Sequence, residues 1–98
     1  MESLIVLPEA EADLEEAFSW YEEQRPGLGS EFLDEVSAAF NRICAYPRAC
    51  PSVEANIRRG FTHRFPYSVY FELEASIYVF AVLHQKQAPA AWYSRANN

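Results

Sequence analysis

Basic side chains and a histidine gather in the C-terminal half of the chain, in the stretch RRGFTHRFPYSVYFELEASIYVFAVLHQK. Arg58, Arg59 and Arg64 lie near its start, and His84 and Lys86 lie at its end. A histidine beside several cations could move a proton and stabilise negative charge, such as that of a phosphate. The alternative is that the histidine bonds locally and the arginines pair with neighbouring glutamates.

Other kinds of reactive site find little support in the sequence. The two histidines and two cysteines are scattered without the spacing of zinc ligands, and the serines stand in no motif that activates a nucleophile. With three glycines in all, the chain has no glycine-rich loop for a phosphate. We therefore expect neither a metal nor a cofactor. Cys44 and Cys50 are expected to be reduced thiols, with a disulfide across the short loop between them as an alternative.

Charge is divided unequally between the two halves of the chain. Residues 1–47 carry eleven acidic residues against two arginines, a balance of −9, whereas residues 48–98 have a balance of +3. An acidic half repels nucleic acid at long range, so we expect no direct DNA binding by this chain alone. The N-terminus lacks the basic start of a signal peptide, and no apolar run is long enough to cross a bilayer. These features predict a cytoplasmic protein without a membrane partner.

Strands are needed to hold the basic side chains in fixed directions. Runs of β-branched and aromatic residues predict strands at about residues 57–65, 68–73 and 77–84, after a short first strand at residues 3–7. On the last of these strands, strict alternation places Ile77, Val79, Ala81 and Leu83 on one face and Tyr78, Phe80, Val82 and His84 on the other. Because both faces are apolar, this strand should be central in the sheet, with the helices on one side.

Two helices are predicted before the last three strands. The first starts at Pro8 and stops near Arg25, where Pro26 and Gly27 break it, and the second runs from about residues 28–30 to just before Pro47. The expected buried faces are Ala10, Leu14, Ala17, Phe18 and Tyr21 on the first helix, and Phe32, Val36, Ala39, Phe40 and Ile43 on the second. The tight connection makes the pair an antiparallel hairpin.

The predicted order of elements is therefore β-α-α-β-β-β. It describes an α+β fold in which a helical hairpin packs on a mainly antiparallel four-stranded sheet. Residues 88–95 are expected to add a short helix or an ordered cap. A chain of 98 residues supports one core, so a single domain should span residues 1–98.

Five segments in this order resemble the RelE/ParE superfamily of bacterial toxins, which includes the plasmid stabilisation proteins. The segments are AEADLEEAFSWYEE, PGLGSEFLDEV, AYPRACP, IRRGFTHRFPYSVYF and AVLHQKQAPAAWYSR. The resemblance spans almost the whole chain and implies the fold deduced above. It also implies the toxin half of a type II toxin–antitoxin module, held inactive by a cognate antitoxin in a hetero-oligomer.

The superfamily divides by target. ParE-like members inhibit DNA gyrase by contact, whereas RelE-like members cut mRNA in the ribosome. The acidic balance favours the ParE-like branch, because binding in an RNA-walled site demands a basic protein. Lys86 followed by Gln87 also stands where relatives often carry an arginine pair. A ribosome-dependent mRNA endonuclease and a non-toxic, antitoxin-binding relative stay as alternatives.

Each interpretation assigns its own residues. An endonuclease would use a histidine with nearby cations, namely His84, Arg58, Arg64 and Lys86. Contact with a target would use arginines and the C-terminal aromatic residues, since these types anchor interfaces: Arg59, Trp92, Tyr93 and Arg95. The antitoxin is expected in the seam between hairpin and sheet, near side chains that lie off the main buried faces: Trp20, Leu33 and Cys44.

Overall fold

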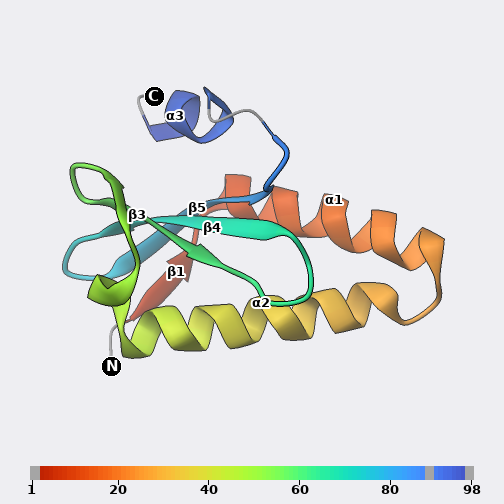
Figure 1. Ribbon diagram of the computed structural model, residues 1–98. Helices are drawn as coiled ribbons and strands as arrows, with labels where there is room; N and C mark the ends of the chain where they lie inside the picture. Colours follow the sequence, from red (N-terminus) through yellow and green to blue (C-terminus); the bar gives the residue numbers. More distant parts are fainter. Residues whose placement is uncertain (1–2, 88–89, 97–98) are drawn as a thin grey trace.

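The computed structural model describes residues 3–87 and 90–96, and it has three layers: a helical hairpin, a sheet and a short C-terminal helix (Figure 1). The elements are β1 (Leu4–Val6), α1 (Pro8–Gln24), α2 (Leu28–Ala45), a 3₁₀ turn (Pro47–Ala49), β2 (Ser52–Glu54), β3 (Ile57–Phe61), β4 (Tyr67–Leu73), β5 (Ile77–His84) and α3 (Ala90–Ala96). The α+β class and the hairpin on a mostly antiparallel sheet are as predicted. Of the predicted C-terminal cap, residues 88 and 89 lie outside the described residues.

The sheet has one strand more than the four expected. Its order is β1-β5-β4-β3-β2, with β1 parallel to β5 and the other neighbours antiparallel. The central position predicted for β5 is confirmed. The extra strand β2 pairs with β3 through only two residue pairs and consists of Ser-Val-Glu, so it lacks the apolar run by which a strand is recognised. It lies between the predicted end of the second helix and the strand expected at about residues 57–65, where no strand was predicted.

The helical hairpin forms where its buried faces and breakers predict. Pro8 occupies the first turn of α1, where its missing N–H costs no hydrogen bond. The helix α2 begins after Gly27, which has a φ of +90° and no side chain to cap the helix. The carboxylate of Glu22 on α1 takes that role, because it accepts hydrogen bonds from the backbone N–H groups of Gly27 and Gly29. The two helices are thus joined by a cap as well as by packing.

A β-bulge in β5 overturns the strict alternation expected for that strand. Tyr70 of β4 pairs with Ala81 and Phe71 pairs with Val79, so Phe80 is an extra residue in the ladder. After the bulge the faces exchange. Ala81 therefore lies with Phe80 and Leu83 in the apolar cluster on the α3 side, and Val82 lies with Ile77 and Val79 in the core beneath the hairpin. The predicted grouping of Ala81 and Leu83 with Ile77 and Val79 was wrong for this reason.

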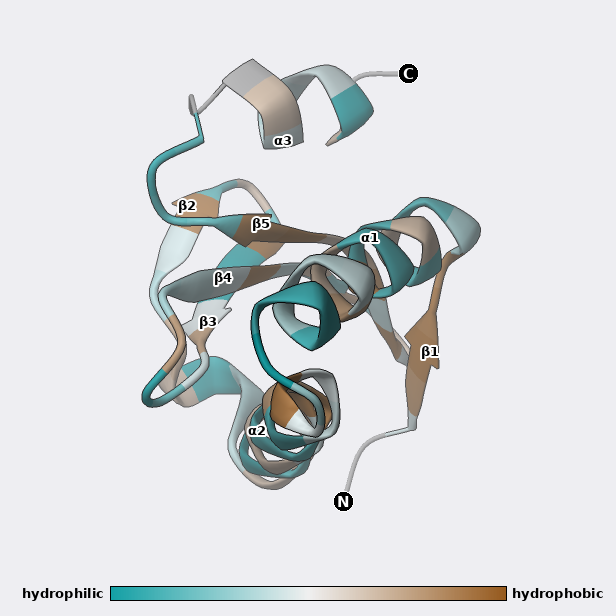
Figure 2. Ribbon diagram, turned by 90° about the vertical axis from the view of Figure 1, so that its right-hand side faces the viewer, coloured by the Kyte–Doolittle hydropathy of each residue, from teal (hydrophilic) through white to brown (hydrophobic). Residues whose placement is uncertain are grey.

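Helices cover both faces of the sheet, whereas one covered face was expected. Figure 2 shows α3 on the side of the sheet opposite the α1–α2 hairpin. Trp92 and Ala91 of α3 pack against Tyr70 and Phe80, and the Trp92 ring stacks on Tyr70 with centroids 5.4 Å apart. None of the described helices has the length and apolar character needed to span a membrane.

Candidate functional site

Two hollows flank the end of the sheet where β4 begins and β5 ends. The first, here named the α1 cavity, lies between α1 and the sheet and has a volume of about 470 Å³. The second, named the α3 cavity, lies on the opposite face beneath α3 and has a volume of about 450 Å³. Gln87 lines both, since it follows β5 at the rim between the two faces.

The α3 cavity combines cationic and aromatic side chains. Arg59, Phe61, Tyr70, Lys86 and Trp92 are among its lining residues. Arg59 and Phe61 are two residues apart on β3 and share a face, and the guanidinium lies 5.0 Å from the centroid of the Phe61 ring. The Nε atom of Arg59 is buried and has no hydrogen-bond partner among the described residues. The cavity therefore combines a guanidinium with aromatic walls.

The α1 cavity combines aromatic and acidic side chains. Trp20 and Tyr21 of α1 make an edge-to-face contact, and Tyr67 of β4 makes another with His84 of β5. Burial raises the pKa of Tyr67 to about 12, with further contributions from Tyr21 and from the negative charges of Glu16 and Asp13. The phenol is thus held in its neutral form beside a negative field.

An ion pair between Asp13, which lines the α1 cavity, and Arg95 ties α3 to α1. The two guanidinium Nη atoms lie 2.6 and 2.9 Å from the two carboxylate oxygens. Asp13 also accepts a hydrogen bond from the Val82 backbone N–H, and Arg95 donates one to the Phe80 carbonyl. The hydrogen bond from Arg95 to Asp13, more than any other cause, raises the pKa of Arg95. Arg95 was expected to contact a target, and in the structure its guanidinium is engaged within the molecule.

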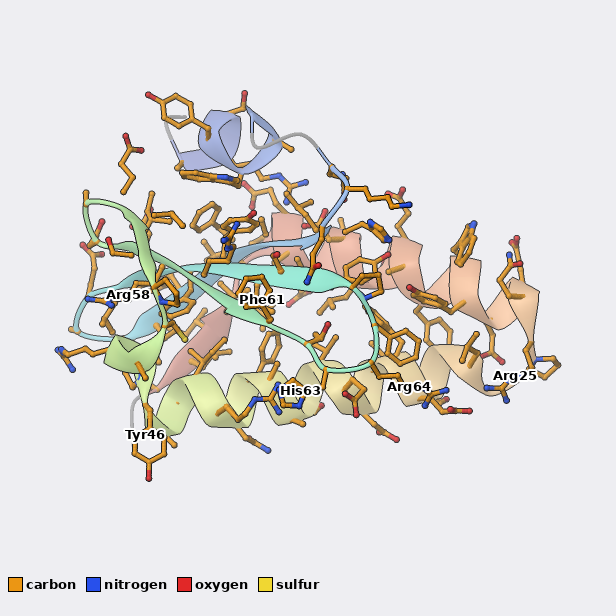
Figure 3. All side chains as sticks on the ribbon, viewed as in Figure 1. Arg25, Tyr46, Arg58, Phe61, His63 and Arg64 are labelled. Atoms are coloured by element: carbon orange, nitrogen blue, oxygen red, sulfur yellow. The ribbon has the colours of Figure 1, made fainter. Side chains whose placement is uncertain are left out.

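The four residues named for an endonuclease do not converge on one point. Arg58 donates hydrogen bonds to the carbonyls of Arg48 and Cys50, so it fastens the loop that follows α2. Figure 3 shows Arg58 at the left of the view and Arg64 well to its right, beyond Phe61 and His63.

Arg64 is likewise engaged, in the turn between β3 and β4. Its guanidinium lies 2.6 Å from the Glu31 carboxylate and packs over the Phe65 ring. The hydrogen bond from Arg64, followed by that from Arg25, lowers the pKa of Glu31. Arg64 thus links the turn to α2.

His84 and Lys86 are close in sequence but line cavities on opposite faces of the sheet. The Nδ1 atom of His84 accepts a hydrogen bond from the Lys86 backbone N–H, and the His84 backbone N–H donates to Gln87. These bonds order the end of β5. They direct the imidazole toward α1 and away from the cations of the α3 cavity.

The structure groups three of the four residues expected to contact a target. Arg59 and Trp92 line the α3 cavity, and the Tyr93 ring, which is 50% exposed, makes an edge-to-face contact with Trp92. The residues expected to bind an antitoxin are more dispersed. Trp20 lines the α1 cavity and Leu33 a shallow hollow between the outer faces of α1 and α2, while Cys44 packs against the core. Both cysteines are free thiols.

Asp13 joins α1, β5 and α3, and the sequence alone did not single it out. One signal was available in its spacing. Asp13 follows Ala10 by three residues and precedes Ala17 by four, so it lies on the predicted buried face of the helix. An acidic residue on such a face requires a partner.

A solved structure shares this fold. The structure described as "Chromosomal ParDE TA system from P. aeruginosa" is similar to this chain, with a TM-score of 0.75 and 19% sequence identity over 86% of this chain and 96% of that one. At this identity, the similarity shows the fold alone. No protein among the curated sequences matches the chain significantly.

A family model settles the membership. The model described as "ParE toxin of type II toxin-antitoxin system, parDE" matches residues 4–89. The chain therefore belongs to the ParE toxin family of type II toxin–antitoxin systems, which confirms the predicted superfamily and implies an antitoxin partner. The matched range ends before α3, so the helix that closes the α3 cavity lies beyond it.

Proposed function

We propose that this chain is a ParE-like toxin subunit that inhibits DNA gyrase by contact, without catalysing a reaction, and that a cognate antitoxin neutralises it. Family membership supports the toxin role and the antitoxin partner. The observation that favours contact over catalysis is the dispersal of the endonuclease candidates. Arg58 is engaged near the start of β3 and Arg64 in the turn that follows it. His84 and Lys86 line opposite faces of the sheet. An acid–base reaction on RNA requires these groups within hydrogen-bond reach of one phosphate.

The surface that we assign to the target is the α3 cavity with its exposed neighbour Tyr93. It brings an arginine, a lysine and three aromatic side chains into one concave surface with Tyr93 beside it, and arginine and aromatic residues dominate interface hot spots. The positive charge of Arg59 and Lys86 fits an acidic patch on a protein partner.

The test is expression of the chain alone and together with the product of the neighbouring gene. The expected result is arrested growth with the chain alone, and normal growth when the neighbour is present. Purified chain should then inhibit gyrase supercoiling or cause gyrase-dependent DNA breaks, and should leave ribosome-bound mRNA intact. Unchanged growth, with no binding by the neighbouring gene's product, would refute the toxin–antitoxin assignment, and mRNA cleavage at codons would replace gyrase with the ribosome.

A further inference from the structure

The α1 cavity has the features of a binding site for a cationic side chain. Glu16 and Trp20 are four residues apart on α1, so their side chains lie along the same side of the helix. Trp20 is 56% exposed, which is unusual for so large an apolar ring. From it a row of rings continues through Tyr21, Tyr67 and His84, with centroids 5.1, 6.2 and 5.3 Å apart in successive pairs. Such a row offers both ring faces and ring edges to an incoming group.

One carboxylate of this cavity is free to pair with a ligand. Asp13 is occupied by Arg95 and by the Val82 backbone N–H. Glu16 is exposed and forms no ion pair with any residue that the structure describes. A cavity that combines a carboxylate with a tryptophan and two tyrosines attracts a cation in two ways. The carboxylate attracts it by charge, and the rings attract it through their negative faces.

The surface of the hairpin is also negatively charged. Six exposed carboxylates on the hairpin have no ion-pair partner within the described part of the chain: Glu9, Glu11, Glu15, Glu16, Glu23 and Asp34. A field of this kind draws a basic segment toward the hairpin and repels an acidic one. Charge complementarity therefore selects the occupant of the cavity. Arginine fits better than lysine, because its planar guanidinium can stack on a ring while it donates two hydrogen bonds to one carboxylate.

We propose that the α1 cavity receives an arginine side chain from a basic docking segment of the antitoxin, stacked on Trp20 and paired with Glu16. The identity of the partner rests on the proposed function, whereas the chemistry of the cavity does not. The two can therefore be tested separately.

The first experiment needs no partner. The isotope-labelled chain is titrated with N-acetyl-L-arginine amide, and with N-acetyl-L-norleucine amide as the uncharged probe of similar length. The arginine probe is expected to shift the Trp20 indole N–H and the signals of Tyr67, and the norleucine probe is not. Glu16→Gln should weaken the response to arginine, whereas Glu15→Gln should not. The second substitution removes the same charge, but Glu15 lines the separate hollow between the outer faces of α1 and α2. Equal responses to both probes, or none at Trp20, would overturn the proposal.

The second experiment measures the affinity of the neighbouring gene's product by calorimetry. Glu16→Gln and Trp20→Leu are each expected to raise Kd about tenfold, given the usual strength of a desolvated cation–π contact and its ion pair. Trp20→Leu keeps apolar bulk, and thermal unfolding checks that each variant folds. Unchanged Kd in both variants would overturn the inference and leave the proposed function standing. If the wild-type chain does not bind, the proposed function fails and the arginine probe alone decides the chemistry of the cavity.

Discussion

The ion pair between Asp13 and Arg95 closes an edge of the sheet that no strand covers. The short strand β1 ends at Val6, opposite Val79, so among the described residues no strand pairs with β5 beyond Val79 on that side. Asp13 accepts the hydrogen bond of the Val82 N–H there, and Arg95 donates to the Phe80 carbonyl. Unpaired backbone groups at such an edge are costly when they are buried, and they also invite pairing with other chains. The ion pair therefore satisfies backbone groups at this edge of the sheet and also holds α3 against α1.

Substitution of Asp13 should destabilise the protein more than substitution of Arg95. Arg95→Gln is expected to lower the free energy of unfolding by about 1 kcal/mol, since it removes charge-assisted hydrogen bonds. Asp13→Ala should lower it by about 2–3 kcal/mol, because the Val82 N–H and the Arg95 guanidinium then both lose their acceptor. Urea unfolding measures these values. Arg25→Gln is the matched control, because its ion pair with Glu31 is exposed and worth little. Equal effects of all three changes would contradict the role given to Asp13.

Glu22, a residue of α1, should behave as the N-terminal cap of α2. Its carboxylate lies 2.9 Å from the Gly29 backbone N–H and 3.1 Å from that of Gly27. Loss of a capping side chain costs about 1 kcal/mol, so Glu22→Ala should lower the free energy of unfolding by that amount. The neighbouring change Glu23→Ala tests the same loss of charge at an exposed position outside the turn. A Glu23→Ala variant that is as unstable as Glu22→Ala would refute the capping role.

The helices and most of the sheet could be predicted because their signals are local. Pro8, Pro26 and Gly27 mark helix boundaries, and the apolar spacing of α2 marks its buried face. The bulge at Phe80 could not be read from an unbroken apolar run, since every residue in it suits either face. The short strand β2 forms only because β3 offers it an edge. Such features depend on tertiary pairing, which alternation along one segment does not encode.

The site was predicted less completely, for a related reason. Residue types identified Arg59, Trp92 and Tyr93, which the fold brings together. They could not reveal that Arg95 turns inward to Asp13, because the two are 82 residues apart in sequence. Sequence spacing also cannot tell which face of the sheet follows a bulge. Spacing along a strand also does not show where the strand ends: β5 ends at His84, and Lys86 lies in the turn that follows, so the two side chains line opposite faces although they are two residues apart.

Alkaline pH should destabilise the protein through Tyr67. Burial is the largest cause that raises the pKa of this phenol from 10.0 to about 12. The native state therefore holds a proton that the unfolded chain releases, so the stabilising contribution is complete below pH 10 and is lost as the pH rises toward 12. Each such proton contributes a slope of at most about 1.4 kcal/mol per pH unit.

Urea unfolding at several values between pH 8 and pH 11 tests this dependence. Tyr67→Phe should flatten the loss of stability, although not completely, because burial also raises the pKa of Tyr21. Tyr46→Phe, at a ring that is 73% exposed and outside this cluster, is the matched control for loss of a phenol hydroxyl. A slope that is identical in Tyr67→Phe and in the wild type would show that Tyr67 is not the group responsible.

Changes in the α3 cavity should separate target inhibition from antitoxin binding. Arg59→Gln and Tyr93→Ala are expected to weaken gyrase inhibition about 30-fold each, the size of an interface hot spot of ~2 kcal/mol. The affinity for the neighbouring gene's product should stay within twofold, because the proposed antitoxin contact lies across the sheet at Glu16 and Trp20. Arg59→Gln should also fold normally, since the buried Nε atom that it removes has no partner among the described residues.

Arg48→Gln, at an exposed arginine of the loop after α2, is the control for loss of charge alone. Equal loss of inhibition in Arg48→Gln would indicate a long-range charge effect, and loss of antitoxin affinity in Arg59→Gln would mean that both partners use the same face.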